Sequence, residues 1–161
     1  MCRYRSDRAG GSGEPAHEPW DVTGDDVGAT IVLAEDEDDL RRLYAECLRR
    51  AGHTVWEAAD GSQATAMVRA HNPDLLLLDL WMPILNGLEV LEQLRDAREA
   101  MTTKIVMLTH QRDADHRLEG FALGIAAYWT KDLSLSEFGE KIEAVLNAVD
   151  VPRPRGGQQL A

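Results

Sequence analysis

The sequence has few cysteines, few aromatic residues and no long apolar run, and each shortage excludes a class of protein. Two cysteines in 161 residues, Cys2 and Cys47, cannot form a disulfide framework, which favours a reducing compartment. No stretch has the length and apolar character of a membrane span, and the basic N-terminus is not followed by the apolar block of a signal peptide. We therefore expect a cytoplasmic protein without a membrane span.

Positive charge is also scarce in this chain. Seventeen basic residues against 28 acidic ones give a net charge of −11. Such a surface repels nucleic-acid phosphates, so we expect no direct nucleic-acid binding. Surplus carboxylates commonly keep a small protein soluble, and that accounts for most of them. The informative acids are those that cluster where a strand is predicted to end.

Three segments differ in composition. Residues 1–28 are rich in Gly, Ser, Pro, Asp and Glu and poor in apolar residues, which predicts a disordered leader. Residues 151–161 are rich in Pro and Gly and predict a short flexible tail, too short for another domain. Residues 29–150 carry the regular apolar pattern, so we expect one domain there.

That middle segment alternates short apolar runs with apolar residues at helical spacing. The predicted strands are 31–34, 53–58, 75–78, 105–108 and 126–130, and a helical pattern follows each of them. Five strand–helix pairs predict an α/β fold of three layers, in which a doubly wound five-stranded parallel sheet lies between two layers of helices. The four leucines 75–78 are apolar on both faces, as in a buried parallel strand.

Polar residues follow four of the five predicted strands directly. Glu35 and Asp36 follow the first, Asp79 the third, Thr109 the fourth and Lys131 the fifth. Open α/β sheets bind ligands at the carboxyl ends of their strands. We therefore expect carboxylates, a hydroxyl and an amine at one edge of the sheet. Each residue alone would be an ordinary turn or surface residue, and their convergence carries the argument.

These residue types suit magnesium-dependent phosphoryl chemistry. Mg²⁺ prefers oxygen ligands, and the carboxylates of Glu35, Asp36 and Asp79, with the backbone carbonyl of Trp81, could supply them. A carboxylate can act as a nucleophile and form an acyl phosphate. The amine and the hydroxyl from the two later strands could each pair with a phosphate oxygen.

Four segments resemble the receiver domain of the two-component response-regulator family. They are IVLAEDEDDLRRL (31–43), PDLLLLDLWMPILNG (73–87), IVMLT (105–109) and AAYWTKD (126–132). The most specific is the D-x-x-M-P…G pattern of Asp79, Met82, Pro83 and Gly87. The resemblance covers about residues 29–150 and implies a flavodoxin-like fold.

The resemblance also assigns a role to each candidate residue. It implies a phosphoacceptor at Asp79, an acidic metal-binding pair at Glu35 and Asp36, a switch hydroxyl at Thr109, a switch aromatic at Tyr128 and a phosphate-sensing lysine at Lys131. The implied cofactor is Mg²⁺, and the implied donor is a phosphohistidine on a sensor histidine kinase or a histidine phosphotransfer protein. The domain would not be an enzyme, beyond self-phosphotransfer and autodephosphorylation.

The resemblance also implies which surface would bind a downstream partner. That face consists of the fourth helix, fifth strand and fifth helix, and here it would include Tyr128 and Trp129. A downstream protein target would bind there, and a phosphorylation-dependent homodimer is compatible with it. Packing of Trp129 in the core is the alternative for that residue. The short tail, 151–161, favours a regulator of the single-domain type.

Two positions depart from the family pattern. His110 stands where a small residue is usual, and Asp132 where proline is usual. Trp81 and Gln111 occupy the positions that overhang the phosphate in the family. We hypothesise that Trp81, His110 and Gln111 tune the lifetime of the acyl phosphate, with the two rings restricting water; the alternative is that both rings point to solvent.

The departures also leave a second function open. The chain could be a pseudo-receiver, a protein-binding module that works without phosphorylation. The intact Asp79, Lys131 and acidic pair favour the phosphorylated switch, whereas His110 and Asp132 favour the alternative. A phosphatase of similar topology would need an additional general acid and a substrate cap, for which we find no segment.

Overall fold

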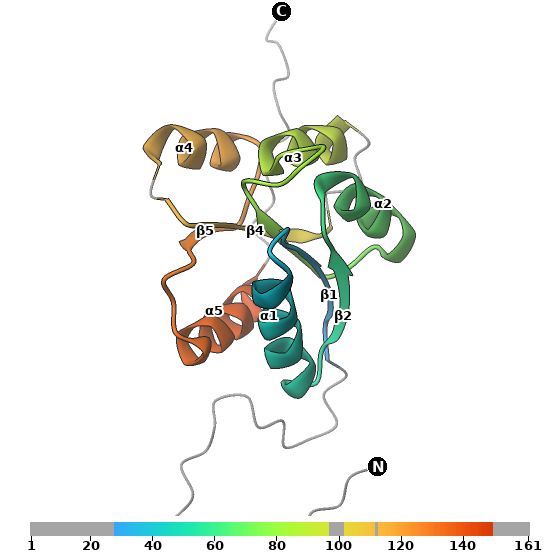
Figure 1. Cartoon of the computed structure of the whole chain (residues 1–161), viewed down its shortest axis with the longest axis vertical. Helices are drawn as coiled ribbons and strands as arrows, with labels where there is room; N and C mark the ends of the chain where they lie inside the picture. The colour runs from blue at the N-terminus through green and yellow to red at the C-terminus, as the bar shows by residue number, and fades with distance from the viewer. Residues whose placement is uncertain (1–27, 97–101, 112, 150–161) are drawn as a thin grey trace, which may run out of the picture.

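Five strands and five helices alternate along the computed structural model, which describes residues 28–96, 102–111 and 113–149 (Figure 1). The elements are β1 (Thr30–Ala34), α1 (Asp38–Arg50), β2 (Thr54–Ala58), α2 (Gly61–His71), β3 (Leu75–Asp79), α3 (Gly87–Asp96), β4 (Lys104–Thr109), α4 (Ala114–Ala122), β5 (Ala127–Thr130) and α5 (Leu135–Asn147). The predicted leader and tail lie outside the described residues, apart from Gly28.

The strands form one parallel sheet in the order β2-β1-β3-β4-β5. The order changes direction between β1 and β3, and the carboxyl ends of the strands at such a point form a crevice. The register pairs Ala34 with Leu78, so the residues that follow β1 lie beside the end of β3. The predicted flavodoxin-like, doubly wound fold is confirmed.

The helices cover both faces of the sheet. Helices α1 and α5 lie on one face, and α2, α3 and α4 lie on the other (Figure 1). Leu75 and Leu77 belong to the core with α1 and α5, whereas Leu76 and Leu78 belong to the core on the other face. All four leucines are fully buried, as the apolar run predicts for a central strand.

Local sequence signals set where the helices end. Gly52 and Gly124 follow α1 and α4 with φ values of 93° and 95°, a conformation that glycine adopts without a steric penalty. Asn72 ends α2 in the left-handed conformation, and Ser134 forms a capping box with Glu137 at the start of α5. None of the helices in the described ranges has the length and apolar character to span a bilayer.

The C-terminal end of α5 is held by a lysine from β4. Lys104 Nζ donates to the carbonyl oxygens of Val145, Leu146 and Ala148 at 3.0, 3.0 and 2.7 Å. The last carbonyls of a helix lack partners within the helix, and a cation there also complements the helix dipole. This contact joins the amino-terminal edge of the sheet to α5.

We expect Lys104→Met to lower the free energy of unfolding by about 1–3 kcal/mol, because three carbonyl oxygens lose a charged donor. Urea unfolding at neutral pH measures the change. Arg42→Met, which removes a cation from an exposed position on α1, is the control and should change stability far less. Equal effects of the two substitutions would contradict a specific contribution of Lys104.

Candidate functional site

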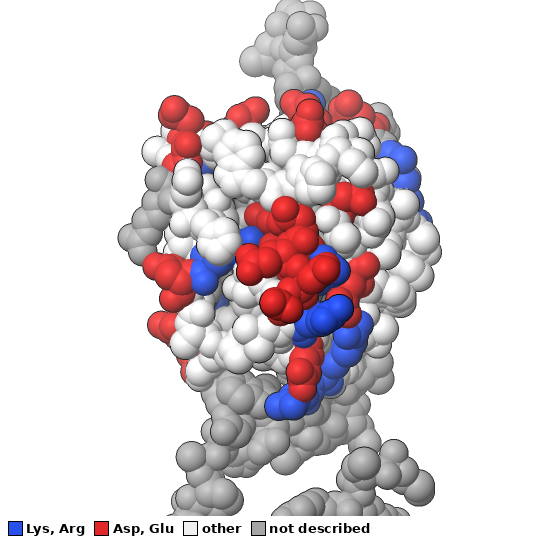
Figure 2. Space-filling view, in the orientation of Figure 1, with Lys and Arg blue, Asp and Glu red and all other residues white. Residues whose placement is uncertain are grey.

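Three carboxylates converge where β1 and β3 end. Oxygen atoms of Glu35, Asp36 and Asp79 all lie within 4.8 Å of one another. Glu35 and Asp79 are buried, whereas Asp36 is exposed. Figure 2 shows acidic side chains gathered at the centre of the face where the loop between β1 and α1 lies in Figure 1. The structure thus brings together the acids that the strand ends predict to meet.

A buried ammonium group lies against two of these carboxylates. Lys131 Nζ is 2.6 Å from Glu35 Oε2 and 3.1 Å from Asp79 Oδ2, and its side chain is 1% exposed. The backbone N–H of Lys131 donates to the carbonyl of Thr109 at 2.8 Å, which fixes the end of β5 to β4. A buried charge is tolerated only when it is paired. Here the pairing requires β1, β3 and β5 to end at the same edge of the sheet.

The surroundings of Asp79 favour its protonated form. Burial and then the negative charge of Glu35 raise the pKa of Asp79 from 3.8 to about 7, against the opposing effect of the Lys131 ammonium. The backbone N–H of Trp81 donates to Asp79 Oδ1 at 3.2 Å. Asp79 therefore has one oxygen facing the ammonium and the other held by the turn that follows β3.

The donor atoms fit Mg²⁺. All three side chains offer carboxylate oxygen, the ligand type that Mg²⁺ prefers, and exposed Asp36 opens the cluster to solvent, from which the ion takes its remaining ligands. Lys131 supplies one positive charge against three carboxylates, so a divalent cation would offset the excess. The Trp81 carbonyl, the fourth predicted ligand, belongs to the residue whose N–H already contacts Asp79.

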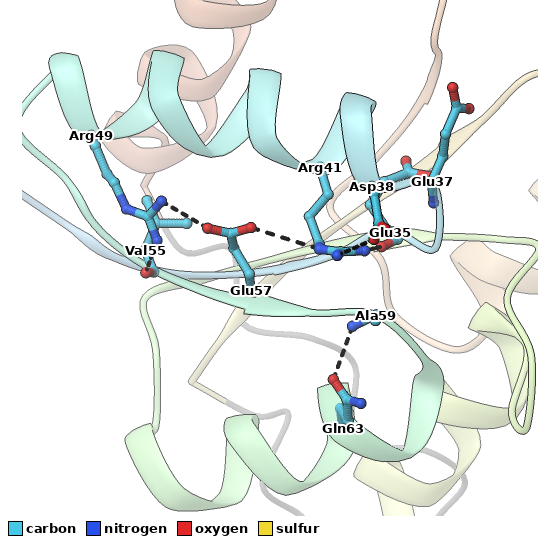
Figure 3. A network of polar contacts seen from close by, with 9 residues as sticks. All are labelled: Glu35, Glu37, Asp38, Arg41, Arg49, Val55, Glu57, Ala59 and Gln63. Atoms are coloured by element: carbon cyan, nitrogen blue, oxygen red, sulfur yellow. Dashed lines mark hydrogen bonds and ion pairs between the residues drawn. The ribbon is translucent and has the colours of Figure 1, made fainter.

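Arg41 holds the loop that carries the acidic pair, as Figure 3 shows. Its Nη1 donates to the Glu35 carbonyl oxygen at 2.7 Å, and the same guanidinium pairs with Asp38. Its Nε lies 3.6 Å from Glu57 on β2, which also pairs with Arg49 at 2.7 Å. The sequence predicts no role for Arg41, because nothing in the helical spacing distinguishes it from Arg42.

The hydroxyl side of the site forms a second group of contacts. Thr109 is fully buried, and its Oγ1 accepts from the backbone N–H of Gln111 at 3.3 Å. The Tyr128 hydroxyl donates to the carbonyl of Gln111 at 3.5 Å. Burial raises the pKa of Tyr128, and a side-chain hydrogen bond with Thr109 opposes that rise. Thr109, Gln111 and Tyr128 therefore form one unit next to Lys131.

The two unusual rings lie on the surface beside the site. The Trp81 side chain is 53% exposed, and its ring meets the His116 ring edge-on with centroids 5.3 Å apart. His110 Nε2 lies 4.0 Å from Glu37 Oε2. Glu37 follows β1 and His110 follows β4, and these strands flank β3, so this pair spans the strand end that carries Asp79.

The glycine of the D-x-x-M-P…G pattern has a steric role. A Cβ atom at Gly87 would lie 2.7 Å from the carbonyl oxygen of Asp79, a distance that real side chains do not adopt. The N–H of Gly87 also donates to the Leu80 carbonyl at 2.8 Å. Glycine thus lets the start of α3 pack directly on the strand end that carries Asp79.

Asp132, where the family usually has proline, accepts a hydrogen bond from the Thr130 hydroxyl. The described residues contain no cis peptide bond. This side-chain contact therefore bridges Lys131 itself, from the residue before it to the residue after it.

In the absence of divalent metal, ionisation of Asp79 should destabilise the fold. The pKa of Asp79 is higher in the folded protein than in the unfolded chain, so its protonated carboxyl group favours the folded state. This contribution to stability is complete below the unfolded pKa of 3.8 and is lost as the pH rises through about 7. Between pH 4 and pH 7 we expect wild type to lose about 1–4 kcal/mol of stability relative to Asp79→Asn, since one pKa unit corresponds to ~1.4 kcal/mol. Thermal unfolding in EDTA across this range measures it, and parallel pH profiles would contradict it.

Comparison with known proteins places this geometry in a family. The protein-family model described as "Response regulator receiver domain" matches residues 31–143. The transcriptional regulatory proteins PhoB of Pseudomonas aeruginosa and TcrA of Mycobacterium tuberculosis are each 34% identical, over 74% and 84% of this chain and 52% and 53% of their own lengths. The chain thus spans about half the length of these curated relatives.

Solved structures agree with this assignment. The chemotaxis response regulator CheY4 of Vibrio cholerae is 26% identical with a TM-score of 0.69, over 73% of this chain and 98% of that one. A putative response regulator from Chloroflexus aurantiacus is 28% identical with a TM-score of 0.68, over 74% and 98%. The chain therefore belongs to the response regulator receiver domain family of two-component systems.

Proposed function

We propose that Asp79 accepts a phosphoryl group from a phosphohistidine, on a sensor histidine kinase or a histidine phosphotransfer protein, and that the domain then signals by protein contact. The observation that carries the proposal is the position of Lys131, whose ammonium touches both Asp79 and Glu35 inside a cluster of three carboxylates. A buried cation beside a carboxylate at the open end of a parallel sheet supports phosphate chemistry at that carboxylate.

The transfer needs the ionised form of Asp79. A carboxylate oxygen attacks phosphorus, the P–N bond to the donor histidine breaks, and its electron pair returns to the imidazole, which leaves an acyl phosphate on Asp79. Lys131 favours the carboxylate form. Bound Mg²⁺ would neutralise charge between the carboxylates and the phosphoryl oxygens, and Glu35, Asp36, Asp79 and the Trp81 carbonyl would hold it.

The neighbouring polar groups would then detect the new charge. The Lys131 ammonium can pair with one phosphoryl oxygen, and the Thr109 hydroxyl can donate to another. Tyr128 contacts both Thr109 and Gln111, so a movement of Thr109 toward the phosphoryl group would change the surroundings of the Tyr128 ring. Hydrolysis would reverse the change, because attack of water on phosphorus restores the carboxylate and releases inorganic phosphate. We propose no turnover of a separate substrate.

The surface formed by α4, β5 and α5 supports the proposed output. A groove of about 880 Å³ lies there and is lined by both Tyr128 and Trp129. Trp129 also packs against the core, so this residue both lines the predicted contact face and contributes to core packing. Leu118 and Phe121 on α4 are 69% and 43% exposed, which suits a protein partner or a second copy bound on phosphorylation. The net charge of −11 on the whole chain argues against nucleic acid as the direct partner, and a chain with only two cysteines, too few for a disulfide framework, is consistent with the cytoplasm.

Incubation with acetyl phosphate and Mg²⁺ tests the proposal directly. We expect wild type to gain the mass of one phosphate group, because Asp79 at the end of β3 lies 3.1 Å from the Lys131 ammonium, which can pair with an incoming phosphoryl oxygen. Intact mass spectrometry measures the gain, which should vanish in Asp79→Asn and in EDTA. Asp39→Asn, which changes an exposed acid in the same acidic segment, is the matched control and should keep it. No gain at any Mg²⁺ concentration would favour the pseudo-receiver.

The proposed tuning of the lifetime includes His110, whose side chain is 65% exposed and lies 4.0 Å from Glu37. Because the pair spans the end of β3, His110→Ala should open the approach of water and speed the loss of phosphate several-fold. Removal of acetyl phosphate, followed by intact mass against time, measures the rate. Gln111→Ala serves as a comparison, since that exposed side chain is the third predicted tuning residue. An unchanged rate in His110→Ala would mean that the ring does not shield the acyl phosphate.

A further inference from the structure

A histidine of α4 contacts the residue that leads away from the phosphoacceptor. The ring of His116 meets the ring of Trp81 at 87° with centroids 5.3 Å apart. Aromatic pairs prefer such edge-on contacts, and they restrict the rotamers of both partners. Trp81 is 53% exposed, so this contact is a restraint on an indole that otherwise faces solvent.

The histidine is itself fixed at the start of its helix. His116 Nδ1 lies 3.0 Å from Asp113 Oδ2. The other carboxylate oxygen of Asp113 accepts from the backbone N–H groups of Asp115 and His116 at 2.9 and 3.3 Å, as the N-cap of α4. The imidazole therefore lies against the same carboxylate that begins the helix, and its side chain is only 28% exposed.

Trp81 is held at its other end by the phosphoacceptor. Its backbone N–H donates to Asp79 Oδ1 at 3.2 Å. One residue thus joins the reactive carboxylate to the first turn of α4, through its backbone at one end and its ring at the other. The position of Trp81 after Asp79 can be read from the sequence, whereas its contact with His116 cannot, because that contact depends on how α4 packs.

We propose that His116 is a positioning residue for the phosphoryl chemistry: by holding the Trp81 indole on α4, it sets how much water reaches the acyl phosphate on Asp79. The inference rests on the proposed function and extends it to a residue outside the site. In this inference, an indole held on α4 limits the approach of water to Asp79, and an indole released from His116 opens that approach for part of the time. His116 acts only through Trp81, and this dependence separates it from residues that touch the phosphoryl group.

The full chain, phosphorylated with acetyl phosphate and Mg²⁺ and then freed of donor, serves for the test. The rate of phosphate loss from Asp79, followed by intact mass, should rise about 2–10-fold in His116→Ala, the range that one aromatic edge contact supports. Trp81→Ala should show a similar rise, and the double variant should lose phosphate no faster than Trp81→Ala alone. His116→Phe, which keeps a ring on Trp81, should restore most of the wild-type lifetime.

A second tryptophan–histidine pair provides the matched control. Trp56 on β2 and His71 at the end of α2 stack with centroids 4.0 Å apart, and His71 precedes β3, away from the end that carries Asp79. His71→Ala should leave the lifetime unchanged although it also removes a histidine from a tryptophan. If thermal unfolding shows that His116→Ala folds poorly, the comparison uses His116→Phe and Trp81→Ala instead.

Two results would overturn the inference while the proposed function stands. In the first, His116→Ala takes up phosphate normally and loses it at the wild-type rate. In the second, His116→Ala speeds the loss equally in the presence and absence of the Trp81 indole, so that it acts by another route. Failure of wild type to take up phosphate at all would overturn the proposed function and this inference with it.

Discussion

The site depends on one buried ammonium group shared between two carboxylates. Lys131 reaches Glu35 and Asp79 with almost none of its side chain exposed. Removal of an ion from water costs roughly several kcal/mol, so this arrangement requires all three groups to be present together. They come from β1, β3 and β5, and only a sheet in which β1 lies beside β3 and the fifth strand ends at the same edge brings them into contact. The cluster of charged groups therefore forms only when the sheet has this strand order.

The site still carries an excess of negative charge, and this excess allows it to bind a cation. One ammonium cannot balance three carboxylates, and burial raises the pKa of Asp79 to about 7. A divalent cation would restore the balance, and a phosphoryl group would give the ammonium a new partner. Two routes then lead from the site to α4 and β5, one through Thr109 and Tyr128 and the other through Trp81.

Much of this could be predicted from the sequence, because parallel strands bring their carboxyl ends to one edge. The apolar runs located every strand, and the residues after them located Glu35, Asp79 and Lys131. Side-chain partners were less predictable. Lys131 was expected to meet a phosphate, and its pairing with Glu35 follows from burial, which a periodic pattern does not measure. The contact of His116 with Trp81 depends on how α4 packs on the sheet, and the apolar pattern of that helix was weak. Cys47 on α1 is a half-buried free thiol that packs against the core.

A crystal structure with Mg²⁺ and beryllofluoride, an analogue of the phosphoryl group, would test the central claim most directly. The account predicts beryllofluoride on a carboxylate oxygen of Asp79, a metal ion held by the carboxylates of Glu35, Asp36 and Asp79 with the Trp81 carbonyl, and Lys131 Nζ in contact with fluoride. Beryllofluoride absent from Asp79 while the metal is bound, or Lys131 still in contact with both carboxylates beside a bound analogue, would contradict it.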